Sequence, residues 1–162
     1  MTNEVSLRQI HENDLPVFFE QQLDPDARRM AAFPARLHDE FMAHWKKVMA
    51  EGAAIVRTII FQGNVAGNIV SWEVHGERRL GYWLGKEYWG KGIASAALAQ
   101  FLEQVRARPV HARVAKHNTA SIRVLQKCGF AICGEDKFAG CGGEQGEEFI
   151  LILEANEQIE AE

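Results

Sequence analysis

The residues with the clearest chemical potential are two glycines, Gly90 and Gly92, which directly precede a run of helical periodicity. Glycine lacks the side chain that would keep a phosphate group away from the backbone. The first amides of a helix have no partners inside the helix, and the helix dipole adds positive potential there. A strand, a glycine turn and a helix N-terminus in succession therefore predict an anion site suited to a phosphate-bearing ligand.

Two familiar glycine loops fit this stretch poorly. A Walker loop needs four residues between its first glycine and a Gly-Lys-Ser/Thr ending, and nothing here supplies them. The dinucleotide fingerprint needs a third glycine where Ser95 stands. It also needs an acidic residue at the end of the next strand, where Lys116 stands. A nicotinamide-binding oxidoreductase therefore remains only as the weaker alternative.

A third loop fits. The stretch WGKGIA, residues 89–94, resembles the acetyl-CoA signature Q/R-x-x-G-x-G/A of the GCN5-related N-acetyltransferase (GNAT) superfamily, with Trp89 in place of the usual Gln or Arg. A second block, residues 117–130, is similar to the superfamily's N-x-x-S/A…G-F segment through Asn118, Ser121 and Gly129. The two blocks occur in family order. The form YWGKG resembles the ribosomal-protein N-terminal acetyltransferase subgroup.

The resemblance implies an α/β (α+β) GNAT fold, with a mixed central sheet of about seven strands flanked by about four helices. It implies transfer of an acetyl group from acetyl-CoA, used as a cosubstrate without a metal, to a primary amine in a ternary complex. The acceptor would be a peptide N-terminus or a small-molecule amine. The resemblance places acetyl-CoA against Trp83, Leu84, Gly85, Trp89, Gly90, Lys91, Gly92, Ile93, Ala94, Ser95 and Asn118.

Two of these positions have a purely structural alternative. Trp83 is equally suited to core packing, because a backbone contact with the cofactor does not require its indole. Asn118 is a preferred residue type for a helix N-cap. The two roles of Asn118 are compatible with each other.

The catalytic groups depart from the family pattern. Many relatives place a Tyr shortly before the Gly-Phe pair, where this chain has Leu125, so Ser121 is the predicted donor of a proton to the leaving thiolate. Many also carry a Glu two residues before Gly-Tyr-Trp, where this chain has Arg79. An amine with a pKa near 10 must lose a proton before it attacks. Glu73, His75 and Glu77 are the nearby candidates, and Glu73 is the predicted general base. These departures leave open an acyl-CoA-binding module with decayed catalysis.

The elements that must position these residues follow from the hydrophobic patterns. Residues 80–84 predict one buried strand before the glycine turn, and the helical stripe continues to Val105. Strand-like runs at 53–61 and 65–74 are joined by short turns, so these strands are antiparallel neighbours. The helix then leads to a strand at 110–114, which is expected to be parallel to 80–84.

The remaining segments complete the expected layout. Further strands are expected at 5–10, 130–133 and 148–153, and further helices from residue 13 or 14 to 22, at 36–50 and at 118–128. Residues 24–34 are interpreted as turn-rich. Residues 137–147 are interpreted as a glycine-rich loop, with a hypothetical role as an acidic lid over the acceptor.

Composition limits the remaining possibilities. The 162 residues are expected to form one domain, 1–162, with 47% hydrophobic and 25% charged residues, as in ordinary soluble proteins. A net charge of −4 gives no basic footprint for nucleic acid. No apolar run approaches the roughly 20 residues of a membrane span, and the start does not resemble a signal peptide. Three cysteines without zinc-like spacing indicate thiols in a reducing cytoplasm. A cytoplasmic monomer or homodimer is expected.

Overall fold

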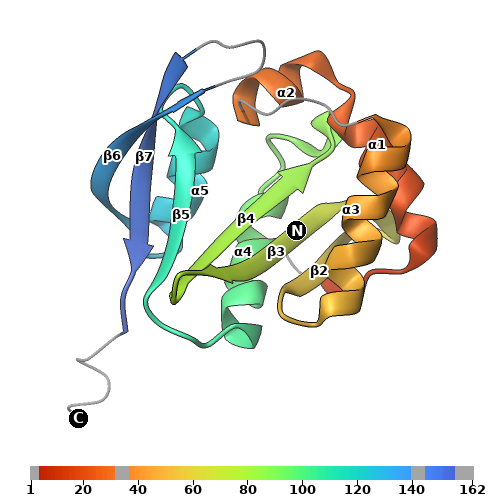
Figure 1. Cartoon of the computed structure of the whole chain (residues 1–162), viewed down its shortest axis with the longest axis horizontal. Helices are drawn as coiled ribbons and strands as arrows, with labels where there is room; N and C mark the ends of the chain where they lie inside the picture. The colour runs from red at the N-terminus through yellow and green to blue at the C-terminus, as the bar shows by residue number, and fades with distance from the viewer. Residues whose placement is uncertain (1–3, 32–36, 140–144, 156–162) are drawn as a thin grey trace.

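The strand patterns of the sequence pair into one mixed seven-stranded sheet in the computed structural model, which describes residues 4–31, 37–139 and 145–155 (Figure 1). The strand order is β1-β2-β3-β4-β5-β7-β6. The strands are β1 (Val5–Arg8), β2 (Ile55–Phe61), β3 (Asn64–Val74), β4 (Glu77–Leu84), β5 (Val110–Ala115), β6 (Ala131–Ala139) and β7 (Gln145–Leu153). Only β4 and β5 are a parallel pair; the other neighbours are antiparallel.

Five α-helices and two short 3-10 helices are described. They are α1 (Leu15–Gln22), α2 (Pro25–Ala31), α3 (His38–Glu51), α4 (Ile93–Gln104), α5 (Thr119–Lys127), η2 (Glu12–Asp14) and η3 (Lys86–Tyr88). The predicted GNAT fold, a mixed sheet of seven strands with flanking helices, is confirmed, with one helix more than expected.

The additional helix is α2, which lies within the segment interpreted as turn-rich. Asp24 caps it, since its Oδ2 accepts a hydrogen bond from the Ala27 amide at 3.0 Å. Pro25 occupies the first helical position, where its missing N–H costs nothing. The turn-like composition of this segment therefore marks the start of a helix.

Helices cover the two faces of the sheet (Figure 1). On one face, α4 and α5 pack on alternate residues of β3, β4 and β5, and this larger core includes Ile69, Leu98, Phe101 and Val110, all fully buried. On the other face, α1 and α3 pack on β2 and β3 around Phe18 and other apolar residues. Because strand side chains alternate between faces, the two cores use alternate positions of the same strands.

The segment at 137–147 differs from its interpretation. β6 extends to residue 139 and β7 begins at residue 145, so the outer parts of the expected loop are antiparallel strand. The central residues Gly140, Gly142, Gly143 and Glu144 lie outside the described residues, and the lid hypothesis with them. None of the helices described here is long and apolar enough to cross a membrane.

Candidate functional site

The central feature of the site is the divergence of β4 from β5. Their parallel register has two rungs, Arg78 with Val110 and Arg79 with His111. Beyond Arg79, β4 pairs with β3 on its other side, and β5 pairs with β7. Figure 1 shows the two strands together at one end and apart at the other. Backbone groups that face such a gap have no strand partner, so an extended ligand can pair with them as an added strand.

The glycine turn lies just past the end of β4. Gly90 and Gly92 have φ angles of 74° and 77°, a left-handed conformation that favours glycine. Both residues are exposed, and a Cβ at either one would meet no atom within 4 Å. Gly92 is the N-cap of α4 and has no side chain with which to cap the amides that follow it. The open backbone and the uncapped helix end thus have the features of an anion cradle.

The other residues predicted to bind acetyl-CoA surround this turn. Lys91 is exposed, Ile93 is buried as the first helical residue, and Ala94 and Ser95 are half-buried in the first turn of α4. The structure therefore brings the whole predicted stretch 89–95 together at the helix N-terminus. Among residues 89–95, only Ile93 is buried in the hydrophobic core.

The end of β4 is fixed by side chains from outside the strand. The indole Nε1 of Trp89 donates to the Leu84 carbonyl at 3.1 Å, and the Trp83 indole donates to the Gln21 carbonyl of α1 at 3.4 Å. Gly85 packs directly on Gln21, because a Cβ on Gly85 would lie 3.0 Å from the Gln21 Nε2. Both indoles thus have protein partners that hold this strand end in place.

The second sequence block contributes a serine with two defined contacts. Asn118 caps α5, since its Oδ1 accepts a hydrogen bond from the Ser121 amide at 3.3 Å. The Ser121 hydroxyl lies 2.8 Å from the phenol oxygen of Tyr82, on the diverging part of β4. Burial raises the pKa of Tyr82 to about 12, and the hydrogen bond between Tyr82 and Ser121 only partly opposes this. The phenol therefore stays protonated at physiological pH.

Glu73, the predicted general base, lies elsewhere. It is near the β3–β4 hairpin, where its Oε1 is 3.9 Å from an amino group of Arg78, and its side chain is 58% exposed. From Arg78 to Leu84 the strand rises by roughly 20 Å, so Glu73 is far from the glycine cradle. The structure does not bring Glu73 together with Ser121.

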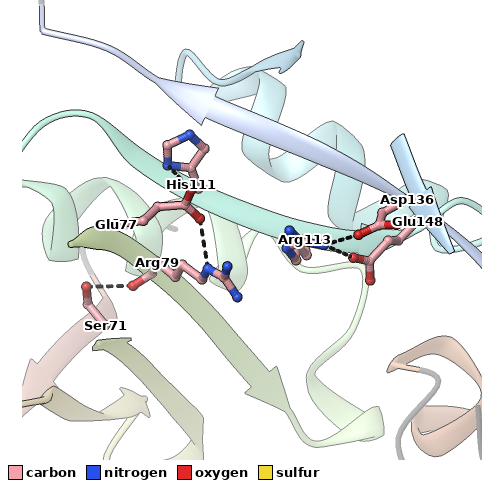
Figure 2. Close-up of polar contacts among 7 residues, drawn as sticks. All are labelled: Ser71, Glu77, Arg79, His111, Arg113, Asp136 and Glu148. Atoms are coloured by element: carbon pink, nitrogen blue, oxygen red, sulfur yellow. Dashed lines mark hydrogen bonds and ion pairs between the residues drawn. The ribbon is translucent and has the colours of Figure 1, made fainter. Parts of the chain in front are cut away.

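A polar cluster lies on the sheet face opposite to Tyr82 and Ser121, at the point where β4 and β5 diverge (Figure 2). Arg79 donates from Nε to Glu77 Oε1 at 2.8 Å, and this bond lowers the pKa of the Glu77 carboxyl. Glu77 Oε2 lies 3.9 Å from Nδ1 of His111. The arginine that replaces the family's glutamate is thus itself paired with a carboxylate.

Four carboxylates of β6 and β7 are paired with cations on or just after β5. Arg113 donates to Asp136 at 2.9 Å and to Glu148 at 2.7 Å, as Figure 2 shows. The bond from Arg113 lowers the pKa of Asp136. Lys116 forms ion pairs with Glu147, at 3.4 Å, and with Glu135. Two cations thus pair with four carboxylates, so half of the negative charge of this cluster is offset.

Helix α2 bridges the open end of the gap. Asp26 forms an ion pair with Lys86, in the turn that follows β4. Near the other end of the helix, the Arg29 carbonyl accepts a hydrogen bond from Nε2 of His117 at 2.7 Å, in the turn that follows β5. One short helix thus connects the two diverging strands where they are farthest apart.

Sequence reasoning missed two structural features of this candidate site, helix α2 and the contact of Tyr82 with Ser121. Helix α2 is signalled by Asp24 and Pro25, as described above. Tyr82 carries no local signal, because only the packing of β4 against α5 brings its phenol to Ser121. Among the described residues, no group of three or more His, Cys, Asp or Glu side chains is arranged to hold a metal ion.

Comparisons with known proteins agree with this geometry. The model of the acetyltransferase (GNAT) domain family matches residues 4–131. An uncharacterised N-acetyltransferase, p20, of Bacillus licheniformis is 32% identical over 72 residues. That match covers 42% of this chain and only 40% of the relative's length.

Two solved structures share the fold over most of their length. Spermidine N-acetyltransferase from Vibrio cholerae, in complex with CoA and spermine, has a TM-score of 0.81 at 19% identity, covering 94% of this chain and 96% of that chain. The ribosomal L7/L12 alpha-N-protein acetyltransferase RimL, in complex with CoA, has a TM-score of 0.80 at 20% identity, covering 93% and 94%. At 19% and 20% sequence identity, the similarity to these two structures shows a shared fold.

Proposed function

Because this chain belongs to the acetyltransferase (GNAT) family of N-acetyltransferases, we propose that it transfers an acetyl group from acetyl-CoA to a primary amine by direct attack in a ternary complex. The observation that carries this proposal is the gap between β4 and β5, which opens beside an uncapped helix end and beside Ser121. A thioester carrier with a phosphate-bearing tail needs these three features together.

The described residues fit acetyl-CoA. The exposed backbone at Gly90 and Gly92 leaves room for phosphate oxygens at the N-terminus of α4. The free backbone edge of β4 suits the amides of the pantetheine arm, which would pair as an added strand. The Asn118 amide group, whose oxygen caps α5, still has its NH2 to offer the arm. Acetyl-CoA brings the activated acetyl group, and the chain supplies its orientation.

Direct transfer is favoured over a cysteine-linked intermediate. Cys128, at the end of α5, has its Sγ 3.8 Å from the Ser95 carbonyl, close to the cradle. Burial raises the pKa of this thiol, so it is mostly protonated at neutral pH. A thiol is a much weaker nucleophile than a thiolate. The attack on the acetyl carbon is therefore assigned to the acceptor amine.

Ser121 is proposed to donate the proton that the departing sulfur needs. Its hydroxyl lies on α5, the helix that follows β5, and it contacts the diverging part of β4. Glu73 remains the base predicted from sequence, although its position near the hairpin gives it no described contact with this region. A water-mediated path to solvent would serve the same purpose.

The acceptor is proposed to be a peptide N-terminus or a small-molecule amine. The two CoA-bound structures of similar fold act on spermidine and on a ribosomal protein, and each acceptor is an amine. In this chain four carboxylates of β6 and β7 are paired with Arg113 and Lys116. These two cations offset half of the charge of the four carboxylates, and the net negative charge that is left suits a cationic amine of either kind.

The test is release of free thiol from acetyl-CoA by the full chain, with spermine, with free amino acids and with peptides that have unblocked N-termini. Turnover with any of them supports the transferase. Stabilisation by acetyl-CoA without turnover on the whole panel would support the alternative, an acyl-CoA-binding module with decayed catalysis. Stronger stabilisation by NAD(P)H than by CoA would contradict both and favour the oxidoreductase alternative.

A further inference from the structure

The hydrogen bond between Tyr82 and Ser121 crosses the gap. Tyr82 is three residues beyond Arg79, the last residue of β4 that pairs with β5. Ser121 is in the first turn of α5, which follows β5. The 2.8 Å contact between their oxygens therefore joins the two sides of the site.

Ser121 is oriented by two partners. Its amide is held by the Oδ1 of Asn118, and its hydroxyl oxygen is held by the phenol of Tyr82. A phenol ionises near pH 10 in water, whereas an aliphatic hydroxyl is about as weak an acid as water, with a pKa of about 16. The stronger acid donates, so the phenol hydrogen bonds to Ser121 Oγ. The Ser121 hydrogen is then free to point toward another acceptor.

A serine hydroxyl alone is a poor proton source for a thiolate. A thiol such as cysteine has a pKa of about 8.5, so transfer from an isolated aliphatic hydroxyl is uphill by roughly 7 pKa units. Burial raises the pKa of Tyr82 only to about 12. Measured from the phenol, the same transfer is uphill by roughly half as much. The phenol thus removes about half of the unfavourable pKa difference that the serine alone would face.

We infer that Tyr82 is a positioning residue that supplies, through Ser121, the proton taken up by the leaving group. As the carbon–sulfur bond breaks, Ser121 gives its hydroxyl proton to the sulfur, and Tyr82 gives its phenol proton to Ser121. The negative charge then rests on the Tyr82 oxygen. Solvent returns one proton to it, which balances the proton that the acceptor nitrogen releases. The inference rests on the proposed function.

The test compares three single substitutions in the full chain. Tyr82→Phe removes only the phenol oxygen, Ser121→Ala removes the hydroxyl, and Tyr88→Phe is the matched control at the only other tyrosine. With acetyl-CoA and either spermine or an unblocked peptide, Tyr82→Phe should lower kcat by about a hundredfold, the low end for a positioned general acid. The KM for acetyl-CoA and the melting temperature should stay close to those of the parent. Tyr88→Phe should keep the parent kcat.

Two further measurements separate proton supply from support of the fold. The double variant should be no slower than Ser121→Ala, because Tyr82 acts only through Ser121. The pKa of the thiol of bound CoA, followed by its ultraviolet thiolate absorbance, should rise in both single variants, by roughly one unit in Ser121→Ala, since a hydrogen bond to a charged group is lost. This titration needs no acceptor.

The outcomes are distinguishable. A Tyr82→Phe protein with the parent kcat, or with an unchanged thiol pKa in bound CoA, would overturn the inference and leave the transferase intact. A parent protein that neither binds CoA nor releases thiol would overturn the proposed function itself. If the parent binds CoA without turnover, the pKa of the bound CoA thiol in Tyr82→Phe alone tests whether Tyr82 acts on the sulfur through Ser121.

Discussion

The backbones of Gly67 and Trp83 approach so closely that a Cβ on Gly67 would lie 2.0 Å from the Trp83 carbonyl oxygen. Gly67 is paired with Leu84, beside an irregularity in the register of β2 and β3 between Ile59 and Ile60. A glycine at this position lets β3 hold the end of β4 where that strand has already left β5. The geometry of the gap thus depends on a residue outside both sequence blocks.

Gly67→Ala should therefore destabilise the protein. The added methyl group must displace backbone, and overpacking of this kind costs about 1–3 kcal/mol. Thermal or urea unfolding would measure the loss. Gly134→Ala is the control, since its Cβ would meet Ile150 at an ordinary 3.7 Å. Equal stability of the two variants would show that β3 and β4 can separate at this point without cost.

Gly92→Val should remove the stabilisation that acetyl-CoA gives. In the parent, acetyl-CoA at about 100 times its Kd should stabilise the fold by roughly 2.7 kcal/mol. In the variant, a branched side chain at a φ of 77° both strains the turn and occupies the open space above the amides. Gly52→Val is the matched control, because Gly52 has a φ of 68° and caps α3, away from the cradle. A ligand-induced melting shift retained in Gly92→Val would rule out the cradle.

Asn118 should have separable roles in stability and binding. Asn118→Ala should lose both the cap of α5 and a contact with acetyl-CoA, each worth about 0.5–1.5 kcal/mol. Asn118→Ser keeps a side-chain oxygen for the Ser121 amide, so it should restore stability but not affinity. Calorimetric titration with acetyl-CoA and thermal unfolding would separate the two. Full recovery of affinity in Asn118→Ser would limit Asn118 to capping.

Asp14 should make stability sensitive to acid. Burial alone would raise the pKa of this carboxyl, but hydrogen bonds from Arg8, from the His11 amide and from Thr58 lower it to about 2. Because the folded-state pKa lies below the ordinary 3.8, the contribution is fully present above about pH 4 and is lost as pH falls toward 2.

That contribution is about 2 kcal/mol by proton linkage. Asp14→Asn should reduce stability near neutral pH by at least this amount and flatten the dependence between pH 4 and 2. Urea unfolding across this range would measure both effects. Asp39→Asn, at a fully exposed position, is the control. An Asp14→Asn protein with the acid sensitivity of the parent would place that sensitivity elsewhere.

The sequence by itself predicted most of the elements and the glycine turn. Alternating and helical patterns predicted the strands and helices around this turn, and Gly90 and Gly92 predicted an anion site, because turns and helix ends are set by neighbours in the chain. The two sequence blocks also led to the family, whose model matches residues 4–131. Asn118 as an N-cap is equally local, since its partner is three residues away.

Only the tertiary structure decided which side chains meet. Tyr82 and Ser121 are 39 residues apart, and their contact depends on how α5 packs against β4. Glu73 precedes the glycine turn by fewer than 20 residues, but it pairs with Arg78 near the start of β4. The extended strand therefore separates it from the glycine turn, which follows the other end of β4. The acids of β6 and β7 suggested an acidic surface, yet strand pairing set Glu148 and Asp136 beside Arg113. Contacts across a sheet follow from register and packing, which no local pattern encodes.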